Sequence, residues 1–254
     1  MTTAQPITVQ PRVALNPTRP GELMILFGTG SYFRAEDRES VNPQIQSLYG
    51  VRDIGAGNNR SLGDRSDMLQ QSITFESQAQ ALGANRVVRQ ISDNTYDSGN
   101  NTNQNNANNA DIGWYLDLVV NGEARGERVI SRATFPSSSR RERVRFSTLR
   151  PDNDPCSGGR EGFIFDLDLA NGGRTAQSVF DINQDNLFNV QDLVDGKMIN
   201  AIGGGFGEEL TIIRNRAGSG DFFYDGGGRR IGSGGPEGRA EGDPLGRQSW
   251  QQLR

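Results

Sequence analysis

Short runs of apolar and β-branched residues, separated by turn residues, recur along the chain. Within residues 113–119, Trp114, Leu116 and Leu118 alternate with Tyr115 and Asp117. A period of two over such short runs predicts β-strands, so we expect an all-β fold. The predicted strands are residues 7–15, 22–27, 46–51, 113–119, 128–135, 143–149, 162–169 and 221–224.

The predicted strands form an internal repeat. The matching segments are 7–13 with 128–133, 23–27 with 144–148, and 48–55 with 163–170. Three antiparallel strands followed by a fourth, repeated, are typical of the blades of a β-propeller. We therefore expect blade-like repeats at about residues 5–120 and 126–225. Two blades cannot close a ring, so the prediction is the C-terminal part of a partial or modified β-propeller over residues 1–254, with an open sandwich as the alternative.

Two polar segments lie between or after these runs. Seven of the ten residues 100–109 are Asn, within a polar stretch at 94–110. Residues 218–254 are dense in Gly with scattered charges. Neither composition buries much apolar surface, so we expect an Asn-rich loop and a Gly-rich C-terminal tail.

The composition excludes several catalytic chemistries. The chain has no histidine, which removes Ser-His-Asp and Cys-His catalysis and imidazole metal ligation. The single cysteine, Cys156, is either a small buried thiol or half of a disulfide whose partner lies outside this chain. Asp166 and Asp168 share a strand face, and we expect exposed or cation-bound carboxylates rather than a glycosidase pair. No catalytic residue is predicted, and we expect a protein that is not an enzyme.

Charge and hydropathy bear on the partners and the location of the protein. The net charge is −4 and the Lys and Arg residues are dispersed, which gives no indication of nucleic-acid binding. No run approaches the 18 apolar residues of a membrane span, so no transmembrane segment is expected. The first 20 residues have no apolar signal core; if the protein is exported, we expect its signal peptide upstream.

The sharpest motif is the stretch at residues 181–192. Oxygen-bearing side chains occur at positions 1, 3, 5, 9 and 12, which is the ligand spacing of an EF-hand-type calcium loop. Position 7 of such loops offers a backbone carbonyl. The predicted Ca²⁺ ligands are Asp181, Asn183, Asp185, Leu187 through its carbonyl, Asn189 and Asp192. The alternative is an Asx-rich turn that holds no ion.

Two departures from the EF-hand pattern predict a modest site. Position 6, usually Gly, is Asn186, and position 12, usually a bidentate Glu, is the shorter Asp192. Residues 192–194 are expected to begin an exiting helix that Gly196 soon ends. We therefore predict a single EF-hand-like loop inserted in a β-fold, with an affinity toward the weak, extracellular end of the calcium range.

Seven segments in order resemble one family. They are residues 25–32, 46–50, 113–118, 126–129, 154–159, 180–181 and 246–250. In this order they are similar to the C-terminal part of PilY/PilC-type type IV pilus biogenesis and adhesion factors. The resemblance covers most of the chain.

The resemblance implies a modified β-propeller, secreted and located at the pilus tip or associated with the outer membrane. It implies that Ca²⁺ at the loop influences pilus extension and retraction, with minor pilins or other tip components as partners and host or abiotic surfaces as adhesion targets. The family's ligands fall on Asp181, Asn183, Asp185, Leu187 and the ninth position. The family often has Asp at that ninth position; Asn189 here is neutral, which weakens the expected binding. The Arg-Gly-Asp motif of some members is absent.

Two other functions fit parts of the pattern. Calcium-dependent quinone dehydrogenases use similar blades, but place the ion beside the cofactor with adjacent cysteines nearby. Dockerin-like interaction modules use the same Asp-x-Asn-x-Asp spacing twice, and only one copy occurs here.

Overall fold

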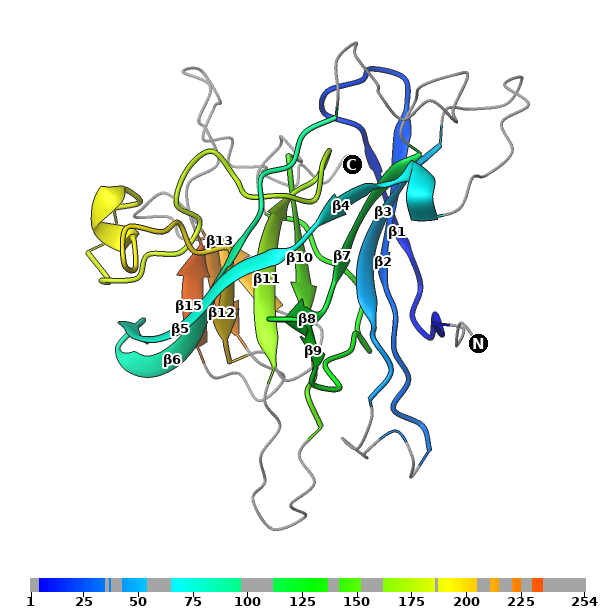
Figure 1. Ribbon diagram of the computed structural model, residues 1–254. Coiled ribbons are helices and arrows are strands. Elements are labelled where there is room, and N and C mark those ends of the chain that lie inside the picture. Colours follow the sequence, from blue (N-terminus) through cyan, green and yellow to red (C-terminus); the bar gives the residue numbers. More distant parts are fainter. Residues whose placement is uncertain are drawn as a thin grey trace, which may run out of the picture.

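The computed structural model describes residues 5–34, 37, 43–53, 65–96, 112–136, 142–151, 162–185, 187–204, 211–214, 221–224 and 230–234. The last three of these segments are described as backbone, apart from the side chain of Asp221. Nearly all regular elements are strands, arranged as two five-stranded sheets that face each other with smaller sheets beside them (Figure 1). The all-β prediction is confirmed. Cys156, residues 97–110 of the Asn-rich segment and most of the predicted Gly-rich tail at 218–254 lie outside the described residues.

The first sheet has the strand order β1-β2-β3-β7-β4. Its strands are antiparallel except for β4, which runs parallel to β7. The bounds are β1 (Arg12–Leu15), β2 (Leu23–Gly28), β3 (Ser47–Asp53), β4 (Leu69–Gln71) and β7 (Gly113–Asp117).

The second sheet has the order β10-β11-β12-β6-β5 and is antiparallel throughout. Leu82 and Gly83, both with positive φ, make the two-residue turn of the β5–β6 hairpin. Such turns match the twist of the flanking strands. The bounds are β5 (Ile73–Ala81), β6 (Ala84–Ile91), β10 (Arg143–Ser147), β11 (Phe163–Asp168) and β12 (Ala201–Gly203).

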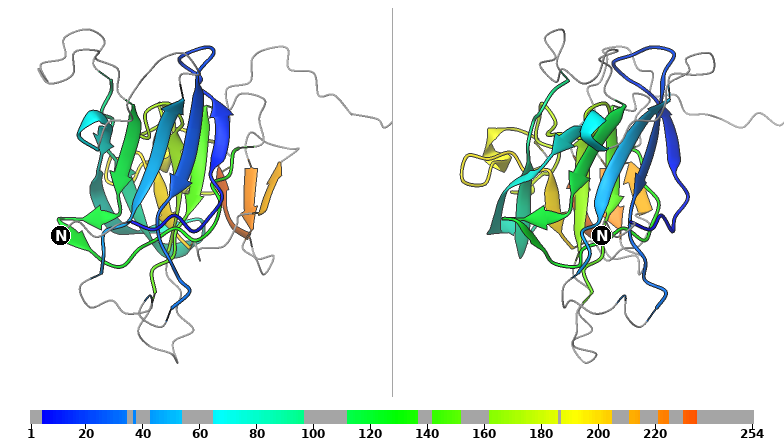
Figure 2. Two further views of the ribbon diagram at one scale, coloured as in Figure 1. Left: turned by 90° about the vertical axis from the view of Figure 1, so that its right-hand side faces the viewer. Right: turned by 45° about the vertical axis from the view of Figure 1, so that its right-hand side comes forward.

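The remaining elements are small. The short 3₁₀ helices η2 (Arg65–Asp67) and η3 (Val190–Asp192) lie in the loops. A two-stranded ribbon is formed by β8 (Val119–Val120) and β9 (Glu123–Ala124). A third sheet contains β13 (Thr211–Arg214), β14 (Asp221–Tyr224) and β15 (Arg230–Gly234). Figure 2 shows the two large sheets stacked, with the third sheet at one side.

The main core lies between the two large sheets. Met24, Leu26 and Trp114 from the first sheet pack in one cluster with Phe146 and Phe165 from the second. All of them are at most 1% exposed. Alternate residues of each strand point into this layer, so the pleat decides which side chains of each strand enter the main core.

Trp114 fits this core because two glycines lie against its ring. A Cβ atom on Gly50 or on Gly172 would overlap the indole, and Gly172 has φ +71. The indole Nε1 donates to the carbonyl oxygen of Leu169 at 3.0 Å, so its polar group is satisfied while buried.

The other face of the second sheet has a core of its own. Val88, Ile164 and Ile202 pack there against Phe180 and Ile182, which come from the long segment between β11 and β12. The second sheet is therefore covered on both faces, and the segment that contains the predicted calcium loop covers the outer one.

The repeat ranges do not coincide with the sheets. β5 and β6 lie within residues 5–120, but they complete the second sheet by pairing with β12. The hairpin joins the second sheet because its residues Ala81 and Val88 are buried in the second core. The second sheet thus contains strands from both predicted repeat ranges.

One predicted strand is wrong. Residues 128–135 pair with β10 and the residues after it only through isolated bridges, Thr134 with Arg145 in β10 and Arg128 with Leu149 beyond its end. Between these bridges the N–H of Val129 donates to the carbonyl oxygen of Thr29 in the first half of the chain. The segment divides its hydrogen bonds between two neighbours, so no continuous ladder forms.

Candidate metal-binding loop

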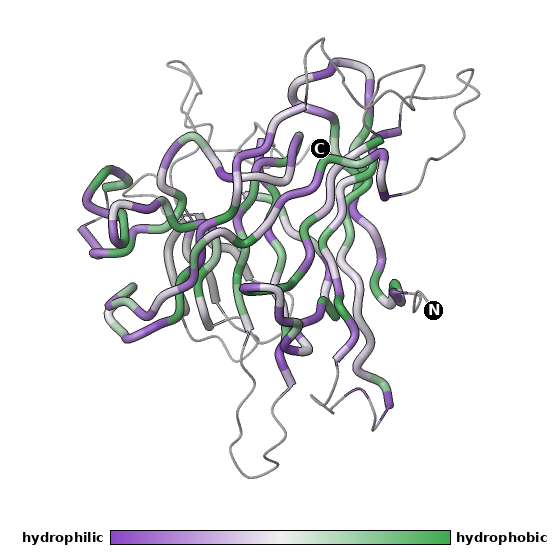
Figure 3. The backbone as a smooth tube through the Cα atoms, in the orientation of Figure 1, coloured by the Kyte–Doolittle hydropathy of each residue, from purple (hydrophilic) through white to green (hydrophobic). Residues whose placement is uncertain are grey.

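The predicted calcium loop begins directly after a buried anchor. Phe180 and Ile182 are buried in the second core, and Asp181 between them is 2% exposed. Figure 3 shows apolar and polar residues following each other closely along this segment. The anchor fixes the start of the loop on the outer face of the second sheet.

Asp192 closes the base of the loop. Its carboxylate accepts hydrogen bonds from the N–H of Ile182 at 2.8 Å and from the N–H of Asn189 at 2.9 Å. The last residue of the predicted loop is therefore tied to the second, Ile182, by a residue that is 1% exposed. Burial raises the pKa of Asp192, and the nearby negative charge of Asp181 raises it further against the lowering effect of the hydrogen bonds.

The tip of the loop is exposed and is held by short Asx turns. The N–H of Asp185 donates to Asn183 Oδ1 at 3.0 Å, and the N–H of Leu187 donates to Asp185 Oδ1 at 2.7 Å. Gln184, with φ 65, takes the left-handed conformation within this turn. Asn186, at the sixth position where such loops usually have Gly, lies outside the described residues.

The exiting helix predicted at residues 192–194 is wrong. Instead, Asn189 caps the 3₁₀ turn η3, accepting from the N–H of Gln191 at 2.7 Å, and the turn ends at Asp192. Leu193 is extended, with φ −77 and ψ 140. Val194 and Lys197 then bridge across a tight turn, so the backbone hydrogen bonds that a helix would need are made elsewhere.

The six predicted ligand positions thus lie in three places. Asp181 and Asp192 lie at the buried base, and Asn189 stands at the start of η3. Asn183, Asp185 and Leu187 are exposed at the tip. Among the residues that the structure describes, no three acidic, histidine or cysteine side chains converge into a metal centre.

The donor chemistry nevertheless fits a hard cation. All six positions offer oxygen, which is the donor that Ca²⁺ takes. Asn183 Oδ1, Asp185 Oδ1 and Asn189 Oδ1 each accept one N–H bond, and an amide or carboxylate oxygen has a second lone pair. The buried negative charges at the base are the electrostatic feature that a bound cation would relieve.

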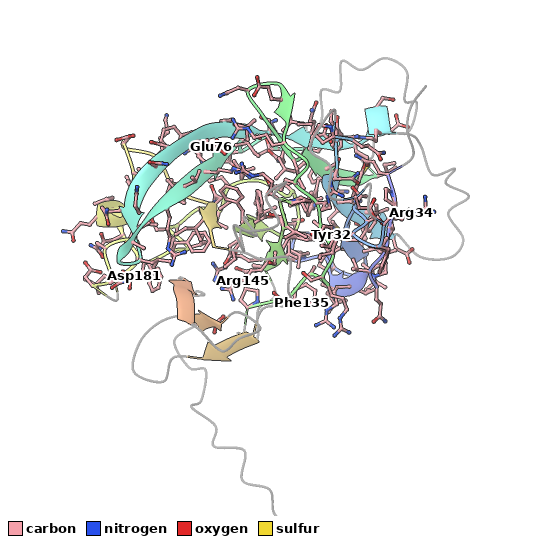
Figure 4. All side chains as sticks on the ribbon, turned by 90° about the horizontal axis from the view of Figure 1, so that it is seen from below. Tyr32, Arg34, Glu76, Phe135, Arg145 and Asp181 are labelled. Carbon is pink, nitrogen blue, oxygen red and sulfur yellow. The ribbon has the colours of Figure 1, made fainter. Side chains whose placement is uncertain are left out.

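The loop touches the turn of the β5–β6 hairpin, which the sequence did not predict. The N–H of Leu82 donates to the carbonyl oxygen of Ile182 at 3.0 Å. A Cβ on Gly83 would lie 3.2 Å from Nε2 of Gln184. Figure 4 shows Asp181 close to the free end of this hairpin. The signal available in the sequence was the Leu82-Gly83 pair between two runs of alternating polarity.

Two ionic networks brace the sheet that carries the loop. Arg89 binds Glu76 and Glu127, each at 2.7 Å, and its guanidinium carbon lies 3.3 Å from the ring centroid of Phe163. Arg125 also binds Glu76 at 2.7 Å. Burial opposes ionisation of Glu76, but the hydrogen bond and charge of Arg89, followed by those of Arg125, lower its pKa overall.

In the second network, Arg145 is fully buried between Asp166 at 2.7 Å and Asp221 at 2.8 Å. Arg143 reaches Asp166 as well, at 3.1 Å. Because Asp221 belongs to β14, this network joins the second sheet to the third, and Figure 4 shows Arg145 beside that sheet. The cation-bound state expected for Asp166 is observed, whereas Asp168 accepts from the backbone of the following turn.

Similarity to known proteins identifies the family. The chain is 31% identical over 230 residues to the type IV pilus biogenesis factor PilY1 of Pseudomonas aeruginosa strain PAO1, a match that covers 85% of this chain. The chain belongs to the PilY1 family. A PilY1 homolog of Xylella fastidiosa strain Temecula1 is 30% identical over 182 residues, or 71% of this chain. These matches span 18% and 13% of the two relatives.

The fold agrees with this membership. The crystal structure of the Pseudomonas aeruginosa PilY1 C-terminal domain superposes with a TM-score of 0.72 and 25% identity, covering 91% of this chain and 45% of that chain. No protein-family model matches the sequence. In the described part of the chain, no helix is long and apolar enough to cross a membrane. The family resemblance inferred from the ordered motifs is confirmed.

Proposed function

We propose that this chain is a calcium-binding, non-enzymatic module of a type IV pilus biogenesis factor. Membership of the PilY1 family is the observation that carries the proposal. Its relatives are named as type IV pilus biogenesis factors, which favours a pilus role over the quinone-dehydrogenase and dockerin-like alternatives. The chain corresponds to under a fifth of the Pseudomonas protein, so its share of that role is the part that this β-domain performs.

Calcium binding is proposed at the loop of residues 181–192. The support comes from the buried base, where Asp181 and Asp192 bring negative charge together, and from the oxygen donors at the tip. Asp181, Asn183, Asp185, the Leu187 carbonyl, Asn189 and Asp192 are the proposed ligands. A bound Ca²⁺ would neutralise the charge at the base and draw the exposed tip toward it.

The proposed affinity is low. Asn189 contributes no charge, and weak extracellular sites have Kd values of roughly 10⁻⁴ to 10⁻³ M. For a Kd of about 0.5 mM, 10 mM Ca²⁺ would stabilise the folded protein by about 2 kcal/mol. Such a site responds to extracellular calcium.

We place the module at the pilus tip or the outer membrane, where minor pilins or other tip components and the contacted surface are its partners. A modified β-propeller is the proposed architecture of the whole domain. Support for it comes from the stacked antiparallel sheets and the superposition on the PilY1 C-terminal domain.

Isothermal titration of the purified protein with Ca²⁺ tests the calcium proposal. The wild-type protein should give a saturable signal in the millimolar range and a matching rise in melting temperature. Asp181→Ala and Asp185→Ala should each abolish both, whereas Asp195→Asn, an exposed change just beyond the loop, should preserve them. Absence of heat and of a thermal shift at millimolar Ca²⁺ would refute calcium binding.

A further inference from the structure

A pocket of about 480 Å³ lies on the second sheet, on the face that lines the main core. Val87 of β6, Phe163 of β11 and Gly203 of β12 line it from three adjacent strands. Sites for small molecules have volumes of roughly 300–1,000 Å³. The pocket is therefore large enough for an organic ligand and is not limited to a single ion.

Amide side chains form part of the pocket wall. Gln78 of β5 and Asn85 of β6 both line the pocket, and both are exposed. In the β5–β6 ladder they share a face with Val87, because alternate residues of a strand point to the same side. An amide both donates and accepts hydrogen bonds, which suits a ligand that carries hydroxyl groups.

The charge of the pocket is positive. Arg86, Arg125 and Arg150 line it, and Glu76 is the one acidic side chain among its described lining residues. The lining thus carries a net charge of +2, in a chain whose net charge is −4. Arg86 Nη1 donates to the carbonyl oxygen of Gly203 at 2.8 Å, which holds this arginine at the pocket. A concave site with an excess of one charge attracts a ligand of the opposite charge.

Glu76 positions Arg125 at the edge of this pocket. Its Oε1 accepts from Arg125 Nη1 at 2.7 Å, while its Oε2 accepts from the buried Arg89 Nε at 2.7 Å. Figure 4 shows Glu76 on the long β5–β6 hairpin. A guanidinium has five N–H donors, and the Arg125 side chain is 35% exposed. Arg125 is therefore fixed by one partner and still accessible to a ligand from solvent.

We propose that this pocket binds a sugar acid, with Arg125 on the carboxylate and the amides of Gln78 and Asn85 on the hydroxyl groups. The planar fork of a guanidinium matches a carboxylate in geometry as well as in charge. The volume exceeds what one inorganic anion fills, and the amides would have no role toward such an ion. Free uronic acids and the uronic acid units of acidic polysaccharides share this chemistry. No described residue of the loop at 181–192 lines the pocket, so the inference does not depend on calcium.

Isothermal titration of the purified 254-residue protein in EDTA tests the ligand class without any variant. Galacturonate and glucuronate are compared with galactose and glucose, which carry a neutral CH₂OH group in place of the carboxylate, and with acetate, which lacks the sugar ring. At least one uronate should bind saturably and at least about tenfold more tightly than its neutral sugar and than acetate. No saturable uronate binding at tens of millimolar, or equal affinity for the neutral sugar or for acetate, would overturn the proposal.

Substitutions then locate the binding site. Arg125→Gln should weaken uronate binding at least about tenfold, because a charged hydrogen bond to the carboxylate is lost. The matched control is Arg174→Gln, since Arg174 is 37% exposed, pairs with one carboxylate, Asp93, and does not line the pocket. The control should bind as the wild type does. Unchanged uronate binding by an Arg125→Gln variant that is folded by circular dichroism would overturn the assignment.

Trigalacturonate distinguishes the two sources of the ligand. Binding of the trimer that is more than threefold tighter than that of galacturonate, and that Arg125→Gln also weakens, would support a polysaccharide unit as the ligand. Equal affinity would support a free sugar acid. Tighter trimer binding that Arg125→Gln leaves unchanged would place the sugar elsewhere on the protein and overturn the proposal.

Discussion

Asp192 gives the most direct test of how the loop is built. Replacing it by Ala removes the carboxylate that accepts from the backbone N–H groups of Ile182 and Asn189. Hydrogen bonds to charged groups contribute roughly 1.5–3 kcal/mol each, which gives about 3–6 kcal/mol for two. Burial and the charge of Asp181 penalise the ionised carboxylate and offset part of this gain. We therefore expect Asp192→Ala to lower the free energy of unfolding by about 2–4 kcal/mol.

Urea unfolding in EDTA, followed by tryptophan fluorescence and circular dichroism, measures this change without calcium. For a chain of this size the midpoint should fall by roughly 1 M urea. Asp192→Asn should lie between the wild type and Asp192→Ala, because an amide oxygen still accepts one of the two bonds. Asp195→Asn should unfold like the wild type.

Adding Ca²⁺ separates the structural role of Asp192 from its proposed role as a Ca²⁺ ligand. Millimolar Ca²⁺ should stabilise the wild-type protein and leave Asp192→Ala unchanged. If Asp192→Ala unfolds within about 0.5 kcal/mol of the wild type in EDTA, the reasoning about loop closure is wrong, because two N–H groups would have lost their acceptor at no cost.

Three other substitutions test the packing and ion pairs of the two large sheets. Gly50→Ala should cost at least about 3 kcal/mol, seen in urea unfolding, because its methyl group overlaps the ring of Trp114. Glu76→Gln should destabilise the protein at pH 7 and progressively less as the pH falls below 4.5, the ordinary pKa of the carboxyl. Ion pairing to Arg89 lowers the pKa of Glu76 in the folded protein below 4.5. The ion pair therefore stabilises the fold above pH 4.5, and this stabilisation is lost as the pH falls through the folded-state pKa. Arg145→Met should cost about 3–5 kcal/mol, measured by thermal and urea unfolding, because it removes the buried guanidinium that binds both Asp166 and Asp221.

Each of these has an internal control. Gly122→Ala has a positive φ but no atom within 4 Å of the added methyl, so a cost equal to that of Gly50→Ala would argue against the packing explanation. A pH-independent effect of Glu76→Gln would contradict the ion-pair account. For Arg145, the double variant Arg145→Met/Asp166→Leu should recover part of the lost stability, and a further loss would show that the buried charge is not the cause.

Sequence pattern was enough to predict part of both large sheets. β2, β3, β7, β10 and β11 fall close to their predicted ranges, because a strand buried on at least one face must place apolar residues with a period of two or in an unbroken run. It was not enough for β4, β5, β6 and β12. β5 is an edge strand in which Glu, Ser and Gln residues make the apolar alternation weak.

For the candidate site too, sequence pattern predicted the local features and missed a long-range contact. The spacing of Asp and Asn residues by itself located a loop at residues 181–192, because the Asx turns and the Asp192 closure depend on neighbours within twelve residues. Contact with the Leu82-Gly83 turn, which lies about a hundred residues earlier in the chain, could not be derived from local spacing.

The sequence by itself determined the all-β class, the strand faces and the positions of the oxygen donors, since each follows from residues close together in the chain. Only the tertiary structure decided that the β5–β6 hairpin joins the second sheet and that the donors divide between a buried base and an exposed tip. These features depend on which apolar surfaces meet, and that is settled by packing between segments far apart in the sequence.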